Sequence, residues 1–283
     1  MKLAQIYHNN RLYITEVVGE ELIPINYEHD TTCLIQEDQH RKKIERMKDF
    51  VIPIEEATFL PPVVRPSKII AIGLNYLDHA TEGNVEIPKT PLVFTKFSSS
   101  LVSHKRYIYW NQTITKQVDY EAELAVIIGK ITQGCSVQDA NDAIWGYTCA
   151  NDVSARDLQF GDGQWVRGKS LDTFCPLGPW VVLKDEIESP LALDIQCRVN
   201  GQIMQQSNTN KMIFPVPELI SFLSNHFTLF PGDIILTGTP DGVGAFRKPP
   251  VYLKHGDQVD VEIESIGCLS NIAFVESENN SDV

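Results

Sequence analysis

Two glutamates near the middle of the chain have the spacing of a metal site. Glu121 and Glu123 lie in the run DYEAELAVIIG, which is typical of a strand, so both side chains point to the same face. Further along, both faces of this strand are apolar, as expected for a strand buried on both sides. Two like charges on a buried strand repel each other unless a positive group lies between them. A hard divalent cation bound by carboxylate oxygens is the simplest such group, although a solvated acidic face is the plainer interpretation.

Asp152 is the leading candidate for a third carboxylate ligand. It ends the run GYTCAND, which predicts a buried strand, and it precedes VSARDLQ, which predicts a helical turn. This turn, from 153 to 159, would place Arg156 and Gln159 on one face. The alternative role of Asp152 is that of an ordinary helix N-cap.

A histidine and a glutamate three residues apart form a candidate acid/base pair. His79 and Glu82 lie in the segment GLNYLDHATEG. On one helical turn Glu82 would orient the imidazole of His79 for proton transfer. Most His-x-x-Glu pairs are surface pairs, so this spacing alone is a weak signal.

Two further segments gather polar groups at the ends of elements. WVRGKSLD offers Arg167 and Lys169 to an anion, and TGTPDGVG follows an apolar strand and offers the hydroxyl of Thr239 together with backbone N–H groups. The glycine loop matches neither a dinucleotide fingerprint nor a Walker A motif, and no clear helix follows it. Phosphate binding is therefore not expected there.

The elements that must position these residues are mostly strands. Some segments alternate apolar and polar residues, and others are bounded by turn residues. On these grounds strands are expected at 2–7, 11–18, 193–199, 233–236 and 259–263. Asn200 and Gly201 predict a hairpin with a type I′ turn. Helices are expected at 36–49, 137–145 and 217–227. Because a βαβ rhythm is missing, we do not expect a doubly wound sheet.

Composition excludes several classes of protein. The 283 residues carry 24 Lys and Arg against 37 Asp and Glu, a formal charge of −13 that argues against nucleic-acid and anionic-membrane surfaces. Neither a signal peptide nor an apolar run of about 20 residues is visible. The six cysteines lie far apart without a CxxC pair, which indicates reduced thiols and a cytoplasmic location.

A proline-rich stretch suggests how the chain is divided. Prolines 53, 61, 62 and 66 interrupt it, and proline fixes φ and removes a hydrogen-bond donor. We therefore expect a small N-terminal α+β domain at 1–62, a catalytic domain at 63–275, and a disordered acidic tail at 276–283.

The order of the motifs along the chain carries more weight than any one of them. The stretches are IIAIGLNYLDHATE, PLVFTK, DYEAELAVIIGK, GYTCANDVSARDLQ, GKSLDTFCPLGP, MIFPVPELI, GDIILTGTPDGVG and IGCLSN. In this order the chain resembles the fumarylacetoacetate hydrolase family over about residues 66–275. It looks most similar to the bacterial oxaloacetate decarboxylase and acylpyruvase branch, on the small N-terminal domain and the stretches GKSLDTFCPLGP and PPVYLKHGD.

The resemblance implies a fold and a set of site residues. The fold is α+β and β-rich, a mixed β-sandwich roll that usually assembles as a homodimer. The implied ligands of Mg²⁺ or Mn²⁺ are Glu121, Glu123 and Asp152. By the same match His79 and Glu82 form the acid/base dyad on a segment that orders over bound ligand, and Lys169 meets a carboxylate or enolate oxygen of the substrate. Arg156, Gln159 and Thr239 line the pocket, whereas Arg167 matches no family site.

The implied function is metal-dependent C–C bond cleavage in a small 2-oxo acid. Oxaloacetate would lose CO₂ to give pyruvate through a metal-stabilised enolate, or His79 would activate water to hydrolyse an acylpyruvate. One alternative is a 2-hydroxyhepta-2,4-diene-1,7-dioate isomerase or a 5-oxopent-3-ene-1,2,5-tricarboxylate decarboxylase of aromatic catabolism. An alternative of another class is a non-catalytic, metal-bound regulatory or binding protein. The sequence does not separate the enzymatic alternatives, because they would share the metal site.

Overall fold

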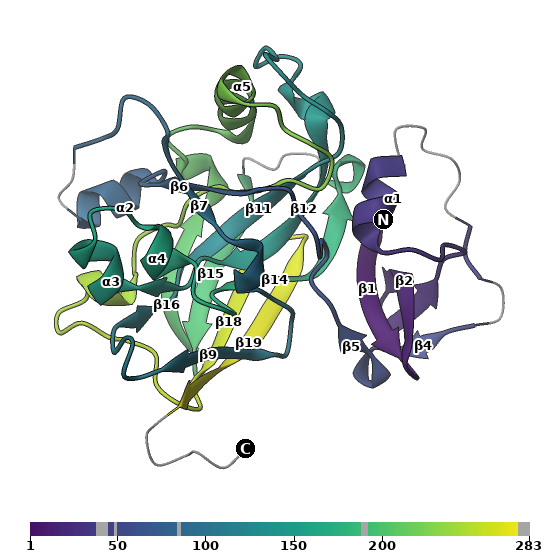
Figure 1. Ribbon diagram of the computed structural model, residues 1–283, viewed down its shortest axis with the longest axis horizontal. Helices are drawn as coiled ribbons and strands as arrows, with labels where there is room; N and C mark the ends of the chain where they lie inside the picture. Colours follow the sequence, from purple (N-terminus) through teal and green to yellow (C-terminus); the bar gives the residue numbers. More distant parts are fainter. Residues whose placement is uncertain (38–44, 48–49, 84–85, 188–191, 277–283) are drawn as a thin grey trace.

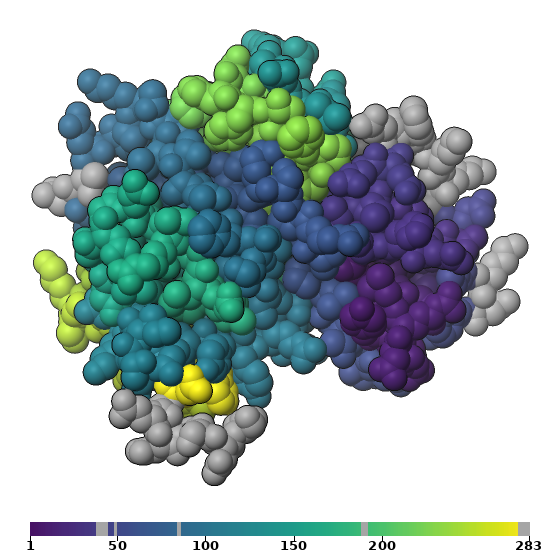
Figure 2. Space-filling view, in the orientation of Figure 1, coloured from purple at the N-terminus to yellow at the C-terminus, as the bar shows by residue number. Residues whose placement is uncertain are grey.

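The computed structural model describes residues 1–37, 45–47, 50–83, 86–187 and 192–276. At the N-terminus, β1 (Lys2–His8), β2 (Arg11–Val18) and β3 (Glu21–Pro24) form the expected antiparallel meander. The short strands β4 (Ile52–Pro53) and β5 (Thr58–Phe59) pair with β3 and β1. These strands have an apolar core of their own, made by Ala4, Ile6, Leu22, Ile52 and Phe59. They form a lobe beside the larger body of the molecule (Figures 1 and 2).

The helix expected at 36–49 is wrong for the described residues 45–47, and among the described residues of this range only 36 and 37 are helical. The helix is instead α1 (Thr31–Glu37), which begins where Asp30 accepts the N–H of Cys33 and Gln5 accepts that of Thr31. Arg46 bridges to Ile25 as in a sheet and forms an ion pair with Glu16. The remaining residues of this expectation, 38–44 and 48–49, lie outside the described residues.

One large sheet runs from the N-terminal meander through the body. Its strand order is β4-β3-β2-β1-β14-β12-β11-β17-β6-β7, with β5 on β1 and β8 on β14. The strands of the body are β6 (Ile69–Gly73), β7 (Leu92–Lys96), β8 (Leu101–Val102), β11 (Ala122–Ile128), β12 (Ile144–Asn151), β14 (Cys175–Leu183) and β17 (Ile234–Leu236). Only two residue pairs, Lys2↔Val182 and Leu3↔Val181, join β1 to β14.

A second sheet packs against the first and closes the core. It has the order β16-β15-β18-β19-β9, and two short strands, β10 (Val118–Asp119) and β13 (Ser154–Ala155), pair separately. Its strands are β9 (Tyr107–Asn111), β15 (Asp194–Val199), β16 (Gln202–Asn208), β18 (Gln258–Ile263) and β19 (Gly267–Glu276). Leu124 of β11, Ile195 of β15 and Val261 of β18 meet in the core between the sheets. The fold is therefore α+β and rich in strands, as expected (Figure 1).

Local signals predicted some elements well. Asn200 and Gly201 have φ values of 52° and 78°, as a type I′ turn requires, and they join β15 to β16. The expected helix at 217–227 is α5 (Val216–His226), which buries Leu219, Ile220 and Leu223. No helix in the described part of the chain is long and apolar enough to cross a membrane.

The helix expected at 137–145 is wrong. A 3₁₀ turn spans Ala140–Ala143, and Ile144 and Trp145 already belong to β12. Pairing of Ile144 with Ile128 of β11 recruits these residues into the sheet, where both side chains are buried. At the other end of the chain, Glu276 is the last residue of β19 and not part of a tail, while residues 277–283 lie outside the described residues.

Candidate active site

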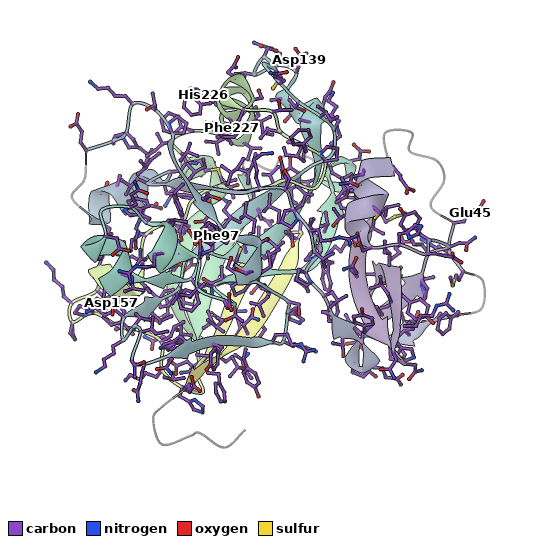
Figure 3. All side chains as sticks on the ribbon, in the orientation of Figure 1. Glu45, Phe97, Asp139, Asp157, His226 and Phe227 are labelled. Carbon is purple, nitrogen blue, oxygen red and sulfur yellow. The ribbon has the colours of Figure 1, made fainter. Side chains whose placement is uncertain are left out.

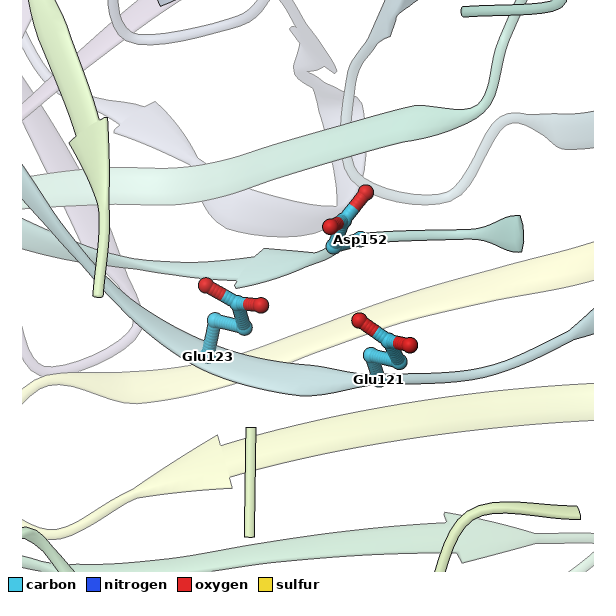
Figure 4. Close-up of side chains that lie close together, drawn as sticks. All are labelled: Glu121, Glu123 and Asp152. Atoms are coloured by element: carbon cyan, nitrogen blue, oxygen red, sulfur yellow. The ribbon is translucent and has the colours of Figure 1, made fainter. Parts of the chain in front are cut away.

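Three carboxylates meet at the ends of two paired strands. Glu121 precedes β11, Glu123 lies within it, and Asp152 follows β12 directly. Antiparallel pairing sets Ala122 opposite Asn151, and the Asp152 N–H donates to the Glu121 carbonyl at 2.9 Å. One oxygen from each carboxylate lies within 4.8 Å of the others, and all three side chains are buried (Figure 4). The structure thus brings together the residues that the sequence suggested as a cation site.

Two cations neutralise one side of this cluster. Lys169, at the end of α4 (Val166–Lys169), places Nζ 2.7 Å from Glu121 Oε2 and 2.8 Å from Asp152 Oδ2. Arg156 Nη2 lies 2.7 Å from Glu121 Oε1. Burial by itself raises the pKa of Glu121, but Lys169 and Arg156 outweigh it and lower that pKa to about 2. Glu121 is therefore held as a carboxylate at all ordinary pH values.

Glu123 is the part of the cluster that lacks positive charge. Burial, Asp152 and Glu121 together raise the pKa of Glu123 well above its usual range. Its Oε2 accepts the N–H of Gly238 at 2.7 Å, and among the described residues it forms no ion pair with a lysine or arginine. Three hard oxygen donors, one of which has no cationic partner in the part of the chain that the structure describes, fit a divalent metal ion such as Mg²⁺ or Mn²⁺.

The glycine loop after β17, residues 237–244, donates backbone hydrogen bonds to carboxylates. Gly238, with φ of +96°, occupies a conformation that side chains rarely adopt, and an added Cβ would lie 2.7 Å from Cβ of Asn75. Three glycine N–H groups of this loop donate to side-chain carboxylates: Gly238 to Glu123, Gly242 to Glu82 and Gly244 to Asp119. The loop therefore orients anionic side chains of the site by backbone hydrogen bonds.

His79 and Glu82 lie on one turn of α2 (Leu77–Glu82), as the spacing predicted. The Nδ1 of His79 is 3.4 Å from Glu82 Oε2, and both oxygens of Glu82 accept the Gly242 N–H, at 3.0 and 3.1 Å. The ring of His79 stacks on Phe246 with a centroid separation of 5.5 Å. A neutral imidazole that donates from Nδ1 to Glu82 has Nε2 left to accept a proton.

The remaining predicted pocket residues surround the same centre. The helix expected from 153 begins only at Arg156, as α3 (Arg156–Gly161), because β13 pairs with β10 first. Arg156 Nη1 donates to Gln159 Oε1 at 2.9 Å, so the two side chains share a face. The Thr239 hydroxyl donates to the Ala122 carbonyl and accepts from Gln205, and it is therefore fixed in orientation. Arg167 is an exposed partner of Asp162, outside this group.

Two buried charged residues had no role assigned from the sequence. Asp119 accepts Arg156 Nε at 2.9 Å and two backbone N–H groups of the glycine loop. Lys96, the last residue of β7, places Nζ 2.5 Å from Asp152 Oδ1. Both belong to quoted motifs, DYEAEL and PLVFTK, which were the signal available in the sequence.

A cavity of about 170 Å³ opens onto these groups. Its polar lining is formed by His79, Glu121, Glu123, Arg156, Gln159, Lys169 and Thr239. Phe94, Trp165 and Phe246 supply apolar walls. The volume is several times the roughly 30 Å³ of a water molecule in the liquid, which suits a small acid.

Comparisons with known proteins extend over most of the chain. Residues 68–273 match the family described as fumarylacetoacetate (FAA) hydrolase C-terminal. The mitochondrial oxaloacetate tautomerase of Rattus norvegicus is 53% identical over 222 residues, or 78% of this chain and 71% of that protein.

Two solved structures share the fold at nearly full length. A fumarylacetoacetate hydrolase from the psychrophile Exiguobacterium antarcticum has a TM-score of 0.88 at 34% identity, covering 98% of this chain and 100% of that one. Maleylpyruvate hydrolase from Sphingobium sp. SYK-6, solved with manganese(II) and pyruvate, has a TM-score of 0.81 at 29% identity, covering 97% and 99%. The matches confirm the fold that the resemblance implied.

Proposed function

The chain belongs to the fumarylacetoacetate hydrolase family, and from this premise we propose that it is a divalent-metal-dependent enzyme acting on oxaloacetate or a closely similar 2-oxo acid. The observation that carries the proposal is the buried cluster of Glu121, Glu123 and Asp152, whose two glutamates line a cavity together with His79 and Lys169. The name of the rat relative supports oxaloacetate, and the Sphingobium hydrolase was solved with both a metal ion and a 2-oxo acid.

Glu121, Glu123 and Asp152 would hold Mg²⁺ or Mn²⁺. Such an ion, when bound, supplies Lewis acidity that polarises the C2 carbonyl of a 2-oxo acid and stabilises negative charge on its oxygen. The residues of the chain supply the rest of the site. Lys169 and Arg156 line the cavity and bring positive charge to the substrate's anionic groups.

His79 is the proposed acid/base residue. It lines the cavity, and Glu82 holds its ring through Nδ1, so Nε2 can take a proton from C3 of the substrate. Return of that proton to C3 or delivery of one to the C2 oxygen interconverts the keto and enol forms. Loss of the C4 carboxylate of oxaloacetate as CO₂ breaks the C3–C4 bond and would leave the enolate of pyruvate, which takes up a proton at C3. An acylpyruvate would need water activated by His79 to attack C4, which releases a carboxylic acid and the same pyruvate enolate. We place tautomerisation of oxaloacetate first, with decarboxylation and acylpyruvate hydrolysis as further reactions of the same site.

A substrate panel distinguishes these reactions. We expect the purified protein with Mg²⁺ or Mn²⁺ to give its highest kcat/KM for keto–enol interconversion of oxaloacetate, followed by ultraviolet absorbance of the enol. Pyruvate and CO₂ release would report decarboxylation, and acetylpyruvate, fumarylpyruvate and 2-hydroxyhepta-2,4-diene-1,7-dioate complete the panel. Preference for the diene-dioate would favour the aromatic-catabolism alternative. No turnover of any of them would favour the non-catalytic one.

Chelation tests the requirement for metal. Excess EDTA is expected to inactivate the enzyme, and added Mg²⁺ or Mn²⁺ is expected to restore activity, because the three carboxylates then regain their cation. Activity is measured before chelation, after it and after metal is returned. Full activity in excess chelator would contradict the metal mechanism.

Assembly and location stay predictions. Homodimer formation follows from the resemblance, and size-exclusion chromatography with light scattering would test it.

The cytoplasmic location was inferred from the cysteines, whereas the name of the rat relative includes the word mitochondrial. All six cysteines are free thiols, three of them buried, in keeping with the reduced state that was expected.

A further inference from the structure

We infer that Lys96 determines which divalent cations the carboxylate cluster prefers, because it engages one oxygen of Asp152. The inference rests on the proposed metal site and adds a residue that does not touch the ion. Lys96 is thus a positioning residue for Asp152, and it belongs to the PLVFTK motif, to which neither the fold nor the proposed chemistry had given a role.

The contacts of Lys96 lie on the interior side of Asp152. Its Nζ is 2.5 Å from Asp152 Oδ1 and 3.2 Å from the Val153 carbonyl oxygen. The side chains of Lys96 and Asp152 are both completely buried. The described residues that line the cavity include Lys169 and do not include Lys96. Lys96 therefore reaches the cluster from within the protein.

Asp152 also contacts a second lysine, Lys169, and this one faces the cavity. Lys169 lines the cavity, and its Nζ contacts the other oxygen of Asp152, Oδ2, together with Glu121 Oε2. The two oxygens of Asp152 thus face different surroundings. Oδ1 contacts Lys96, which does not line the cavity, and Oδ2 contacts Lys169, which does.

Lys96 is held firmly in this position. It ends β7, where it pairs with Ile69 of β6, and the hydroxyl of neighbouring Thr95 donates to the Ile69 carbonyl. A buried ammonium without a partner costs several kcal/mol, so Lys96 does not leave Asp152 without a large penalty. The backbone of Asp152 is fixed as well, by its hydrogen bond to Glu121.

Of the two oxygens, Oδ2 is the one that a cation could take. Lys169 can release Oδ2 and keep Glu121 Oε2 as its partner, whereas Asp152 is the one carboxylate that Lys96 contacts among the described residues. Mg²⁺ is small, requires near-octahedral geometry and uses few carboxylate oxygens. Ca²⁺ accepts six to eight oxygens and often takes both oxygens of one carboxylate. By holding Oδ1, Lys96 prevents Asp152 from binding a cation through both of its oxygens. This favours Mg²⁺, the smaller ion, over Ca²⁺.

The test compares cation preference in Lys96→Met and Lys96→Gln with the wild type. Methionine fills similar space without a donor, and glutamine ends one bond short of the Nζ position. Chelator-treated protein is titrated calorimetrically with Mg²⁺, Mn²⁺ and Ca²⁺. Because changes to groups around metal ligands typically alter affinity about 10- to 100-fold, we expect the Ca²⁺-to-Mg²⁺ affinity ratio to rise about tenfold or more in Lys96→Met. A smaller rise in the same direction is expected in Lys96→Gln.

A matched control separates preference from stability. Lys68 Nζ lies 2.6 Å from the fully buried carboxylate of Asp233, outside the site, so Lys68→Met removes a comparable lysine–aspartate pair. It should lower the melting temperature and leave the affinity ratio unchanged. If Lys96→Met does not fold, Lys96→Gln decides.

Two results would overturn two different claims. A Ca²⁺-to-Mg²⁺ affinity ratio within about twofold of the wild type in the folded Lys96 variants is small beside the roughly 10- to 100-fold changes in affinity that are typical near metal ligands, and it would overturn the role of Lys96 alone. A wild type that binds none of the three cations would instead overturn the proposed metal site.

Discussion

Glu123→Gln is expected to abolish binding of Mg²⁺ and Mn²⁺ and, at the same time, to stabilise the protein in the presence of EDTA. The carboxylate of Glu123 is one of three oxygen donors, and an amide carries no charge with which to replace it. Burial and the neighbouring carboxylates of Asp152 and Glu121 raise the pKa of Glu123. A neutral isostere removes this repulsion, so loss of function and gain of stability should occur in one variant.

The gain of stability should depend on pH in a defined direction. A folded-state pKa above the unfolded value gives stability that is present below the unfolded pKa and is lost as pH rises through the folded one. The metal-free wild type should therefore lose unfolding free energy as pH rises above the ordinary range of a glutamate. Glu123→Gln lacks this loss, so its advantage in melting temperature should grow with pH.

Calorimetric metal titration and thermal denaturation in EDTA at several pH values measure both effects. Glu218, an exposed residue in the first turn of α5, provides the matched control. Glu218→Gln should change neither metal affinity nor the pH dependence. If Glu123→Gln keeps wild-type metal affinity, Glu123 is not a ligand. If its melting temperature falls instead of rising, the electrostatic account of the cluster is wrong.

His79→Gln is expected to lower turnover by about 10²- to 10⁴-fold, the usual contribution of a general acid/base, while metal affinity stays near that of the wild type. The imidazole is held by Glu82 and by stacking on Phe246, and it lines the cavity without belonging to the carboxylate cluster. The measurement is steady-state turnover of oxaloacetate together with calorimetric metal titration.

His226 provides a matched histidine control at the end of α5, on the outside of the molecule (Figure 3). Its Nδ1 lies 2.8 Å from the Phe222 carbonyl, so His226→Gln removes an imidazole that is far from the proposed chemistry. This variant should keep full activity. Should His79→Gln weaken metal binding as strongly as Glu123→Gln does, His79 would be a ligand and the acid/base assignment would fail.

Much of the site was recognisable before the structure because it is encoded at short range. Glu121 and Glu123 share a face since strand side chains alternate, and His79 and Glu82 share one since helix neighbours recur at three and four residues. Arg156 and Gln159 follow the same rule, although the helix that carries them begins three residues later than expected. Each of these pairs needs only the local backbone geometry.

Two expected helices failed because contacts with distant segments place their residues in or beside strands. Trp145 fits an amphipathic helix, but pairing of β12 with β11 and β14 makes it part of a strand. In the same way, Glu45 to Met47 lie beside β3 and not in a helix, because Arg46 bridges to Ile25 and pairs with Glu16. In both cases contacts with distant segments outweigh weak local propensity.

Local sequence patterns were sufficient to identify the types and the local faces of the reactive groups: three carboxylates, a His–Glu pair, and an arginine and a lysine that follow in the chain. Which lysine or arginine contacts which carboxylate oxygen follows from the packing of distant segments. Lys96 ends β7 and Asp152 directly follows β12; they are 56 residues apart in the chain, and β11, β17 and β6 lie between their strands in the sheet, yet Nζ and Oδ1 meet at 2.5 Å. Such a contact leaves no periodic trace in the chain, since it depends on strand order, whereas side-chain alternation along one strand depends only on the backbone.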